Sequence, residues 1–156
     1  MADSPRIAVI DDNTDYLFTM ETFLKKSGFT VFTADNGKEG LDLVRREKPD
    51  VVLLDVMMET LFSGFEVCKI LRTDAELKHI AIIGITGMGD ELGIDYNQWP
   101  DFDYFSPELF LEKPVDKQRL LQFIPEAIAK AAERARRPEW EKQREEKWAK
   151  MQSDSK

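Results

Sequence analysis

The chain has 156 residues, of which 42% are hydrophobic and 33% are charged, so it can bury the core of one domain with a short appendage. No stretch approaches the roughly 18 consecutive apolar residues of a membrane helix. The start of the chain lacks a secretory signal and the single cysteine excludes an internal disulfide, so we expect a cytoplasmic protein. Residues 1–125 carry 13 basic and 23 acidic side chains, an acidic body that argues against nucleic-acid binding.

The first part of the chain alternates short apolar runs with amphipathic helical patterns. Residues 6–10 predict a strand, and Asn13 or Thr14 can cap a helix that runs through residue 26. Residues 29–34 predict a second strand. A helix is expected over 36–46, because an Asn at its start is followed three positions later by Glu, as in a capping box.

The same alternation continues beyond residue 50 and then fails. Residues 51–54 are a continuous apolar run, which is typical of a buried parallel strand. A helix over 64–72 and a strand over 80–85 follow. Residues 87–107 are rich in acidic and aromatic side chains and show no convincing helical face, and 109–111 predict a short fifth strand. Strands and helices in this order predict an α/β fold in which helices cover both faces of a parallel sheet.

The C-terminal part is predicted to be helical. A last helix begins at Asp116, and Pro125 is expected to kink or interrupt it. Residues beyond 125 are rich in Ala, Glu, Lys and Arg, which favour helix, although the last few residues are expected to be disordered. We therefore divide the chain into a domain over 1–125 and a helical extension over 126–156.

Polar side chains follow or end four of the predicted strands: Asp11 and Asp12 the first, Asp55 the third, Thr86 the fourth and Lys113 the fifth. In a parallel sheet these strand ends share one edge, where ligands bind. Carboxylates packed together repel one another unless a cation lies between them, and oxygen ligands suit Mg²⁺. A carboxylate beside Mg²⁺ can act as a nucleophile toward a phosphoryl group that a lysine and a hydroxyl hold. The residue types therefore fit phosphoryl transfer to Asp55.

Four segments of the chain resemble the response-regulator receiver family, over roughly residues 5–125. They are VIDDN at 9–13, LLDVMM at 53–58, GITG at 84–87 and EKP at 112–114, each at a predicted strand end. The resemblance implies a doubly wound five-stranded parallel sheet, flavodoxin-like or CheY-like, here with an irregular fourth crossover and a helical C-terminal extension. It also implies a signalling protein of a two-component or phosphorelay system rather than a dedicated enzyme.

The resemblance assigns roles at the phosphorylation site. Asp55 looks like the phosphoacceptor. Asp12 would bind Mg²⁺ directly and Asp11 through water, and the backbone carbonyl of Met57 would be a further metal ligand. The phosphodonor would be a sensor histidine kinase or a phosphotransfer protein.

The resemblance also assigns the residues that would change conformation on phosphorylation. Thr86 would bind the phosphoryl group and swing toward it, and Lys113 would pair with the phosphate. The bond from Lys113 to Pro114 is expected to be cis. Phe110 stands where the family often has an aromatic side chain that changes rotamer on activation. No DNA-binding motif follows, so we expect output through contact with a downstream protein.

Some features depart from the family and leave alternatives open. Glu59 stands where the family usually has proline, and residues 87–107 are longer than usual. These features favour a receiver-like docking module that works without phosphorylation. Trp140 and Trp148 lie on one helical face, so the extension could fold onto its own domain or mediate self-association.

Two other protein classes of similar architecture fit less well. An aspartate-nucleophile phosphohydrolase usually needs a second carboxylate two positions after the nucleophile, where this chain has Met57. A flavodoxin needs a phosphate-binding loop after the first strand, where Asp11 and Asp12 would repel phosphate.

Overall fold

A computed structural model describes residues 4–55, 63–86 and 107–135, although the side chain of Thr86 is not among the described atoms. Met57, Glu59, the irregular segment before residue 107 and the end of the chain lie outside these residues, and so do the predictions made for them. Within the described residues, no helix is both long enough and apolar enough to cross a membrane.

The five strands form one fully parallel sheet. In spatial order they are β2 (Thr30–Ala34), β1 (Arg6–Ile10), β3 (Val51–Asp55), β4 (Ala81–Thr86) and β5 (Leu109–Glu112). The chain runs outward from β1 in one direction to β2 and in the other to β3, so the topological switch point lies between β1 and β3. Ligands bind at such points in doubly wound folds. The predicted fold class is confirmed.

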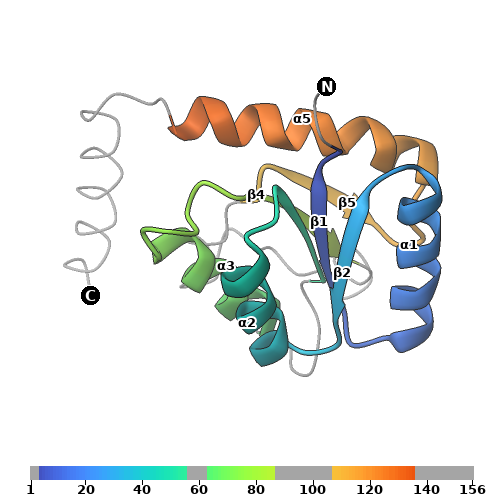
Figure 1. The fold of residues 1–156 in the computed structure, drawn as a ribbon, viewed down its shortest axis with the longest axis horizontal. Helices are drawn as coiled ribbons and strands as arrows, with labels where there is room; N and C mark the ends of the chain where they lie inside the picture. The colour runs from blue at the N-terminus through green and yellow to red at the C-terminus, as the bar shows by residue number, and fades with distance from the viewer. Residues whose placement is uncertain (1–3, 56–62, 87–106, 136–156) are drawn as a thin grey trace, which may run out of the picture.

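Helices cover both faces of the sheet (Figure 1). Helices α1 (Thr14–Lys26) and α5 (Lys117–Ala135) pack on one face, and α2 (Gly37–Glu47) and α3 (Ser63–Thr73) pack on the other. The three central strands, β1, β3 and β4, are therefore buried on both faces, and their side chains alternate between the two cores. On β1, for example, Val9 lies in the α1 and α5 core and Ile10 lies in the α2 and α3 core. This double burial explains why these strands are apolar runs rather than alternating patterns.

The helix starts follow the predicted capping. The side chain of Asn13 accepts a hydrogen bond from the backbone N–H of Tyr16, and the side chain of Asn36 accepts one from Glu39. Gly28, directly after the α1 C-cap, has a φ of 99°, a left-handed conformation that glycine adopts without strain. The local sequence thus sets where α1 begins and ends and where α2 begins.

The predicted interruption at Pro125 does not occur. Helix α5 is continuous from Lys117 to Ala135 with Pro125 inside it. Pro125 lacks the backbone N–H that would bond to the carbonyl four residues earlier. Its side chain is exposed to solvent. The turns on either side of it bury Leu120, Ile124, Ala127 and Ala131 against the sheet, and this burial holds the helix together. Residues 126–135 therefore pack on the same core as residues 117–125, while the division at residue 125 stays a prediction.

Candidate functional site

The sheet register brings the predicted carboxylates together. Ile10 pairs with Leu54, so Asp11 and Asp55, one residue further along their strands, are neighbours. Asp11 is 1% exposed and Asp55 is 4% exposed, whereas Asp12 is exposed. One carboxylate oxygen from each of the three residues lies within 4.8 Å of the other two. These are the acidic residues predicted to gather at the carboxyl edge of the sheet.

Lys113 reaches into this cluster from the end of β5. Its Nζ lies 2.9 Å from Asp11 Oδ2 and 3.4 Å from Asp55 Oδ2. Burial alone lowers the pKa of Lys113, but the hydrogen bond to Asp11 and the charges of Asp55 and Asp11 outweigh it and raise that pKa above the ordinary lysine value. The ammonium is therefore a stable positive charge among the carboxylates. The peptide bond from Lys113 to Pro114 is cis, as predicted.

The loop after β1 ties Asp11 to the start of α1. Asp11 Oδ1 accepts a hydrogen bond of 2.9 Å from the backbone N–H of Asn13, and Asn13 Oδ1 in turn accepts one of 3.0 Å from the backbone N–H of Tyr16. The Tyr16 ring then lies against Lys113, with the Nζ 4.6 Å from the ring centroid. The carboxylate, the helix cap, the aromatic ring and the lysine form a closed chain of contacts, which positions these side chains relative to one another.

The acidic cluster fits a hard divalent cation. Its three side chains offer only oxygen ligands, and Mg²⁺ binds through one or two carboxylates while keeping several waters. Asp12 is exposed and Asp11 and Asp55 are buried, so the cluster has a solvent-facing side where such waters can remain. Asp11, Asp12 and Asp55 are thus the described residues that could hold Mg²⁺. Met57, whose backbone carbonyl was predicted as a further ligand, lies outside the described residues.

The predicted switch residues lie on the last two strands. Thr86 ends β4 and pairs with Glu112 in the register, one residue before Lys113. Phe110 is 44% exposed on β5. Its ring packs over Gly84, since a Cβ built on that glycine would lie 3.0 Å from two ring carbons. The strand positions therefore agree with the prediction for both residues, and their roles in switching stay predictions.

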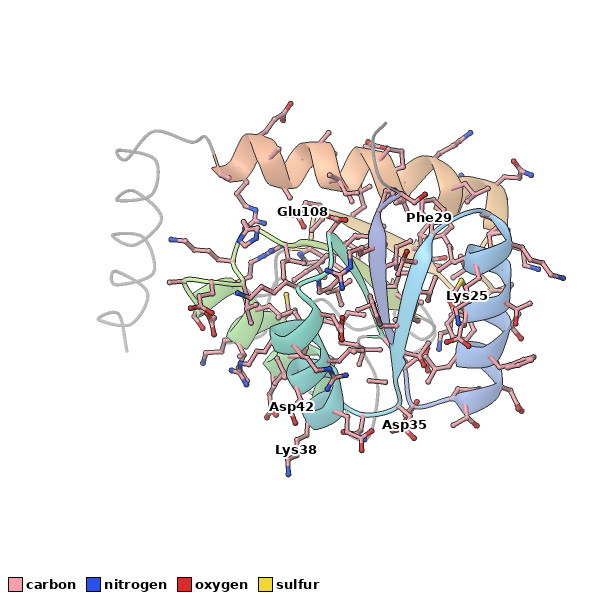
Figure 2. The ribbon with its side chains drawn as sticks, viewed as in Figure 1. Lys25, Phe29, Asp35, Lys38, Asp42 and Glu108 are labelled. Carbon is pink, nitrogen blue, oxygen red and sulfur yellow. The ribbon has the colours of Figure 1, made fainter. Side chains whose placement is uncertain are left out.

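A buried ion cluster at the other end of the sheet was not foreseen from the sequence. Glu108, directly before β5, pairs with Arg72 at 2.7 Å and with Arg134 at 2.9 Å, and it accepts a hydrogen bond of 2.7 Å from the backbone N–H of Ile82. Its side chain is 4% exposed, and it lies beneath α5 (Figure 2). The two arginines also donate to the backbone carbonyls of the loop before β4, at Lys78 and Ile80. The cluster joins the C-terminal ends of α3 and α5 to the edge of the sheet.

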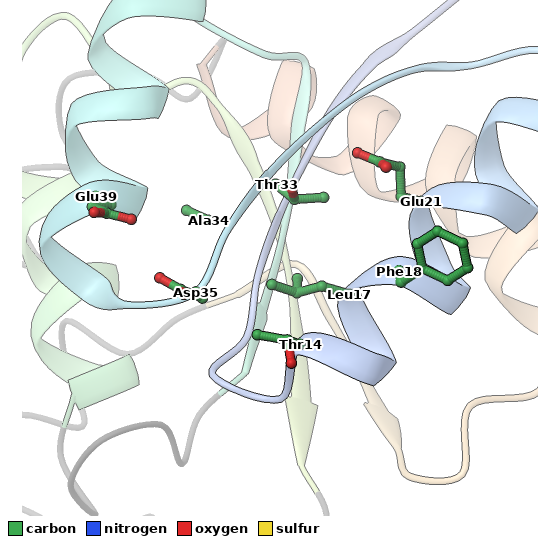
Figure 3. A pocket seen from close by; sticks show the side chains of 8 residues that line it. All are labelled: Thr14, Leu17, Phe18, Glu21, Thr33, Ala34, Asp35 and Glu39. Atoms are coloured by element: carbon green, nitrogen blue, oxygen red, sulfur yellow. The ribbon is translucent and has the colours of Figure 1, made fainter.

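An open hollow of about 350 Å³ lies beside α1, apart from the acidic cluster (Figure 3). Its lining comes from α1, the end of β2 and the start of α2, and includes Glu21, Asp35 and Glu39 together with the exposed ring of Phe18. None of the predicted site residues lines it. The hollow is therefore separate from the predicted site at the strand ends.

Comparisons with known proteins agree with this architecture. The family model of the response regulator receiver domain matches residues 7–125. Protein PilH from Pseudomonas aeruginosa is 35% identical over 124 residues, which are 80% of this chain and 98% of PilH. The polar-differentiation response regulator DivK from Brucella anthropi is 30% identical over 128 residues, which are 80% of this chain and 97% of DivK.

A solved structure supports the same assignment. The response regulator receiver domain protein from Clostridium thermocellum is 29% identical, with a TM-score of 0.67, and the match covers 81% of this chain and 95% of that one. The family model spans most of the described sheet and helices, and both relatives are matched over almost their whole length. The chain belongs to the response regulator receiver family of two-component signalling systems.

Proposed function

We propose that Asp55 accepts a phosphoryl group from a sensor histidine kinase or a phosphotransfer protein, with Mg²⁺ held by Asp11, Asp12, Asp55 and the carbonyl of Met57. The observation that carries the proposal is the pairing of Asp55, which is 4% exposed, with the Lys113 ammonium at 3.4 Å. A buried carboxylate with a fixed cation beside it is a good place for a group that carries up to about two negative charges.

In the proposed reaction, a carboxylate oxygen of Asp55 attacks the phosphorus of a phosphohistidine. The bond from phosphorus to the histidine nitrogen breaks, its electron pair stays on the imidazole, and an acyl phosphate forms on Asp55. Lys113 places its positive charge beside the phosphoryl oxygens, and the Thr86 hydroxyl binds one of them. Mg²⁺, when bound, neutralises charge on the transferring phosphoryl group.

Phosphorylation would change the charge at the ends of β3, β4 and β5. Lys113 and Thr86 would follow the phosphoryl group, and Phe110 on the same strand as Lys113 would change its rotamer. The surface formed around residues 87–112 would then bind a downstream protein differently in the two states. The proposal includes a cytoplasmic location, which suits a chain whose single cysteine, Cys68, excludes an internal disulfide.

Amide spectra recorded with Mg²⁺ and beryllofluoride, a mimic of the phosphoryl group on aspartate, test this function. Shifts at Asp55 and Thr86 that spread through residues 87–112 are the expected result. Shifts confined to Asp11, Asp12 and Asp55 would contradict the switch. Partner binding that is equally strong in the wild type and in an Asp55→Asn variant would instead support a docking module that works without phosphorylation.

A further inference from the structure

Lys113 contacts an aromatic ring, that of Tyr16, in addition to its two carboxylate partners. The Lys113 Nζ lies over the Tyr16 ring, 4.6 Å from its centroid, and the same nitrogen forms ion pairs with Asp11 and Asp55. A cation over an aromatic face is attracted by the negative face of the ring, and the attraction is stronger where water is partly excluded. The Lys113 side chain is 29% exposed, so water is only partly excluded from this contact.

The ring is held in place independently of Lys113. Tyr16 lies in the first turn of α1, where its backbone N–H donates to the Asn13 cap. Its side chain packs against the core between α1, α5 and the sheet. Because backbone and side chain are both fixed, the ring can serve as a rigid wall for the lysine.

The two carboxylate partners of Lys113 would also interact with the ligands of the site. Asp11 and Asp55 are the residues that would hold the cation, and Asp55 would also carry the phosphoryl group. A carboxylate that binds a divalent cation attracts the ammonium less, because its charge is shared. The Tyr16 ring keeps its full attraction in that situation.

We propose that Tyr16 is a positioning residue, whose aromatic face keeps the Lys113 ammonium beside Asp55 while cation and phosphoryl group occupy the carboxylates. This inference rests on the proposed phosphorylation of Asp55. It concerns the ring and not the hydroxyl: among the described residues, the buried Tyr16 hydroxyl has no hydrogen-bond partner. Tyr16→Phe therefore removes no hydrogen bond seen here and keeps the ring, which makes it the matched control.

The first measurement needs no phosphorylation. In the metal-free wild type, the ε-methylene protons of Lys113 should show an upfield ring-current shift in the NMR spectrum, and Tyr16→Phe should retain it. Adding Mg²⁺ should leave this shift in place. Loss of the shift on adding Mg²⁺, or its absence from the start, would overturn the proposal even if Asp55 is phosphorylated normally.

The second measurement is the rate of phosphorylation by phosphoramidate at saturating Mg²⁺. Tyr16→Leu and Tyr16→Met should each be slower than the wild type by roughly three- to tenfold, as expected for one partly buried cation–π contact, and Tyr16→Phe should lie within about twofold. In a Lys113→Met background, Tyr16→Leu should not slow phosphorylation further, because Tyr16 affects the rate only by positioning Lys113.

Three results would contradict the proposal: a wild-type rate in both non-aromatic variants, equal slowing in Tyr16→Phe, or the same slowing in the Lys113→Met background. Failure of the wild type to take up phosphate at all would overturn the proposed function instead, while the ring-current measurement would still report on the contact. The wild-type spectrum also keeps the test decisive if the non-aromatic variants do not fold.

Discussion

Lys113 forms its shorter ion pair with Asp11, at 2.9 Å. Asp11 is also one of the three carboxylates whose oxygens lie close enough to share a cation. The lysine and a divalent cation therefore compete for the same carboxylates, and each repels the other. Metal binding and the position of Lys113 are linked in this site, and the linkage has a measurable consequence.

Replacing Lys113 with Met should tighten Mg²⁺ binding by about tenfold, because the variant removes a positive charge a few Å from the site and frees Asp11. Isothermal titration calorimetry at fixed ionic strength measures the affinity. Lys117→Met is a suitable control, since Lys117 lies over the Phe23 ring and not in the acidic cluster. Unchanged or weaker binding in the Lys113 variant would contradict the competition.

The free energy of unfolding of the metal-free protein should fall more steeply at alkaline pH in the wild type than in the variants Tyr16→Phe and Lys113→Met. Burial, then Asp11 and Asp55, raise the pKa of Tyr16, and that of Lys113 is also raised. A group whose pKa is raised by folding contributes its full stabilisation to the folded state below its unfolded pKa. This stabilisation is lost as the pH rises above the unfolded pKa. The ordinary pKa is 10.0 for tyrosine and 10.5 for lysine, so the loss begins near pH 10.

Tyr16→Phe and Lys113→Met each remove one of these titrating groups. Urea unfolding at several pH values between about 8 and 11, a range chosen around the ordinary pKa values of tyrosine and lysine, should show a shallower alkaline loss in each variant. The same pH dependence in the wild type and both variants would show that folding does not raise these pKa values.

The ion cluster around Glu108 should be sensitive to the loss of the Glu108 carboxylate. Glu108→Gln removes the charge that pairs with Arg72, whose side chain is 7% exposed, and with the partly buried Arg134, and breaking a buried ion pair in this way costs about 3–5 kcal/mol. Chemical denaturation measures the change in the free energy of unfolding. Glu47→Gln is the matched control, because its ion pair with Arg6 is half-exposed and such pairs contribute at most about 1 kcal/mol. Equal effects in the two variants would contradict the structural role of the cluster.

Gly40→Ala should destabilise the protein although alanine is the better helix former. A Cβ at Gly40 would lie 2.7 Å from Ile10 Cδ1 in the fully buried core. Overpacking costs about 1–3 kcal/mol, more than the roughly 1 kcal/mol that alanine adds as a helix former. Asp42→Ala on the exposed face of α2 serves as the control in the same denaturation experiment. A Gly40→Ala protein at least as stable as the wild type would show that Ile10 moves aside freely.

The fold could be predicted because local patterns and the global arrangement agree. The apolar runs and the Asn13 and Asn36 caps all appear in the structure as expected, with strand ends shifted by a residue. The approach of Asp11 to Asp55 followed from the sheet, because the carboxyl ends of parallel strands meet at one edge.

Other features could not be predicted because they depend on contacts between distant segments. Tyr16 looks like an ordinary packing residue of α1, and only the position of Lys113 makes its ring part of the site. Glu108 looks like a solvated residue before a strand until α3 and α5 bring two arginines to it. The interruption predicted at Pro125 does not occur, since burial of α5 on the sheet outweighs one missing hydrogen bond.

The central claim is that Asp55 accepts the phosphoryl group, and intact-mass spectrometry tests it most directly. The protein is incubated with phosphoramidate and Mg²⁺, in parallel with Asp55→Asn, which keeps the size of the side chain and removes the nucleophile. We predict a mass gain of one phosphoryl group in the wild type, lost on treatment with hydroxylamine as expected for an acyl phosphate, and no gain in the variant. Equal labelling of the Asp55→Asn protein, or no labelling of the folded wild type, would contradict the assignment.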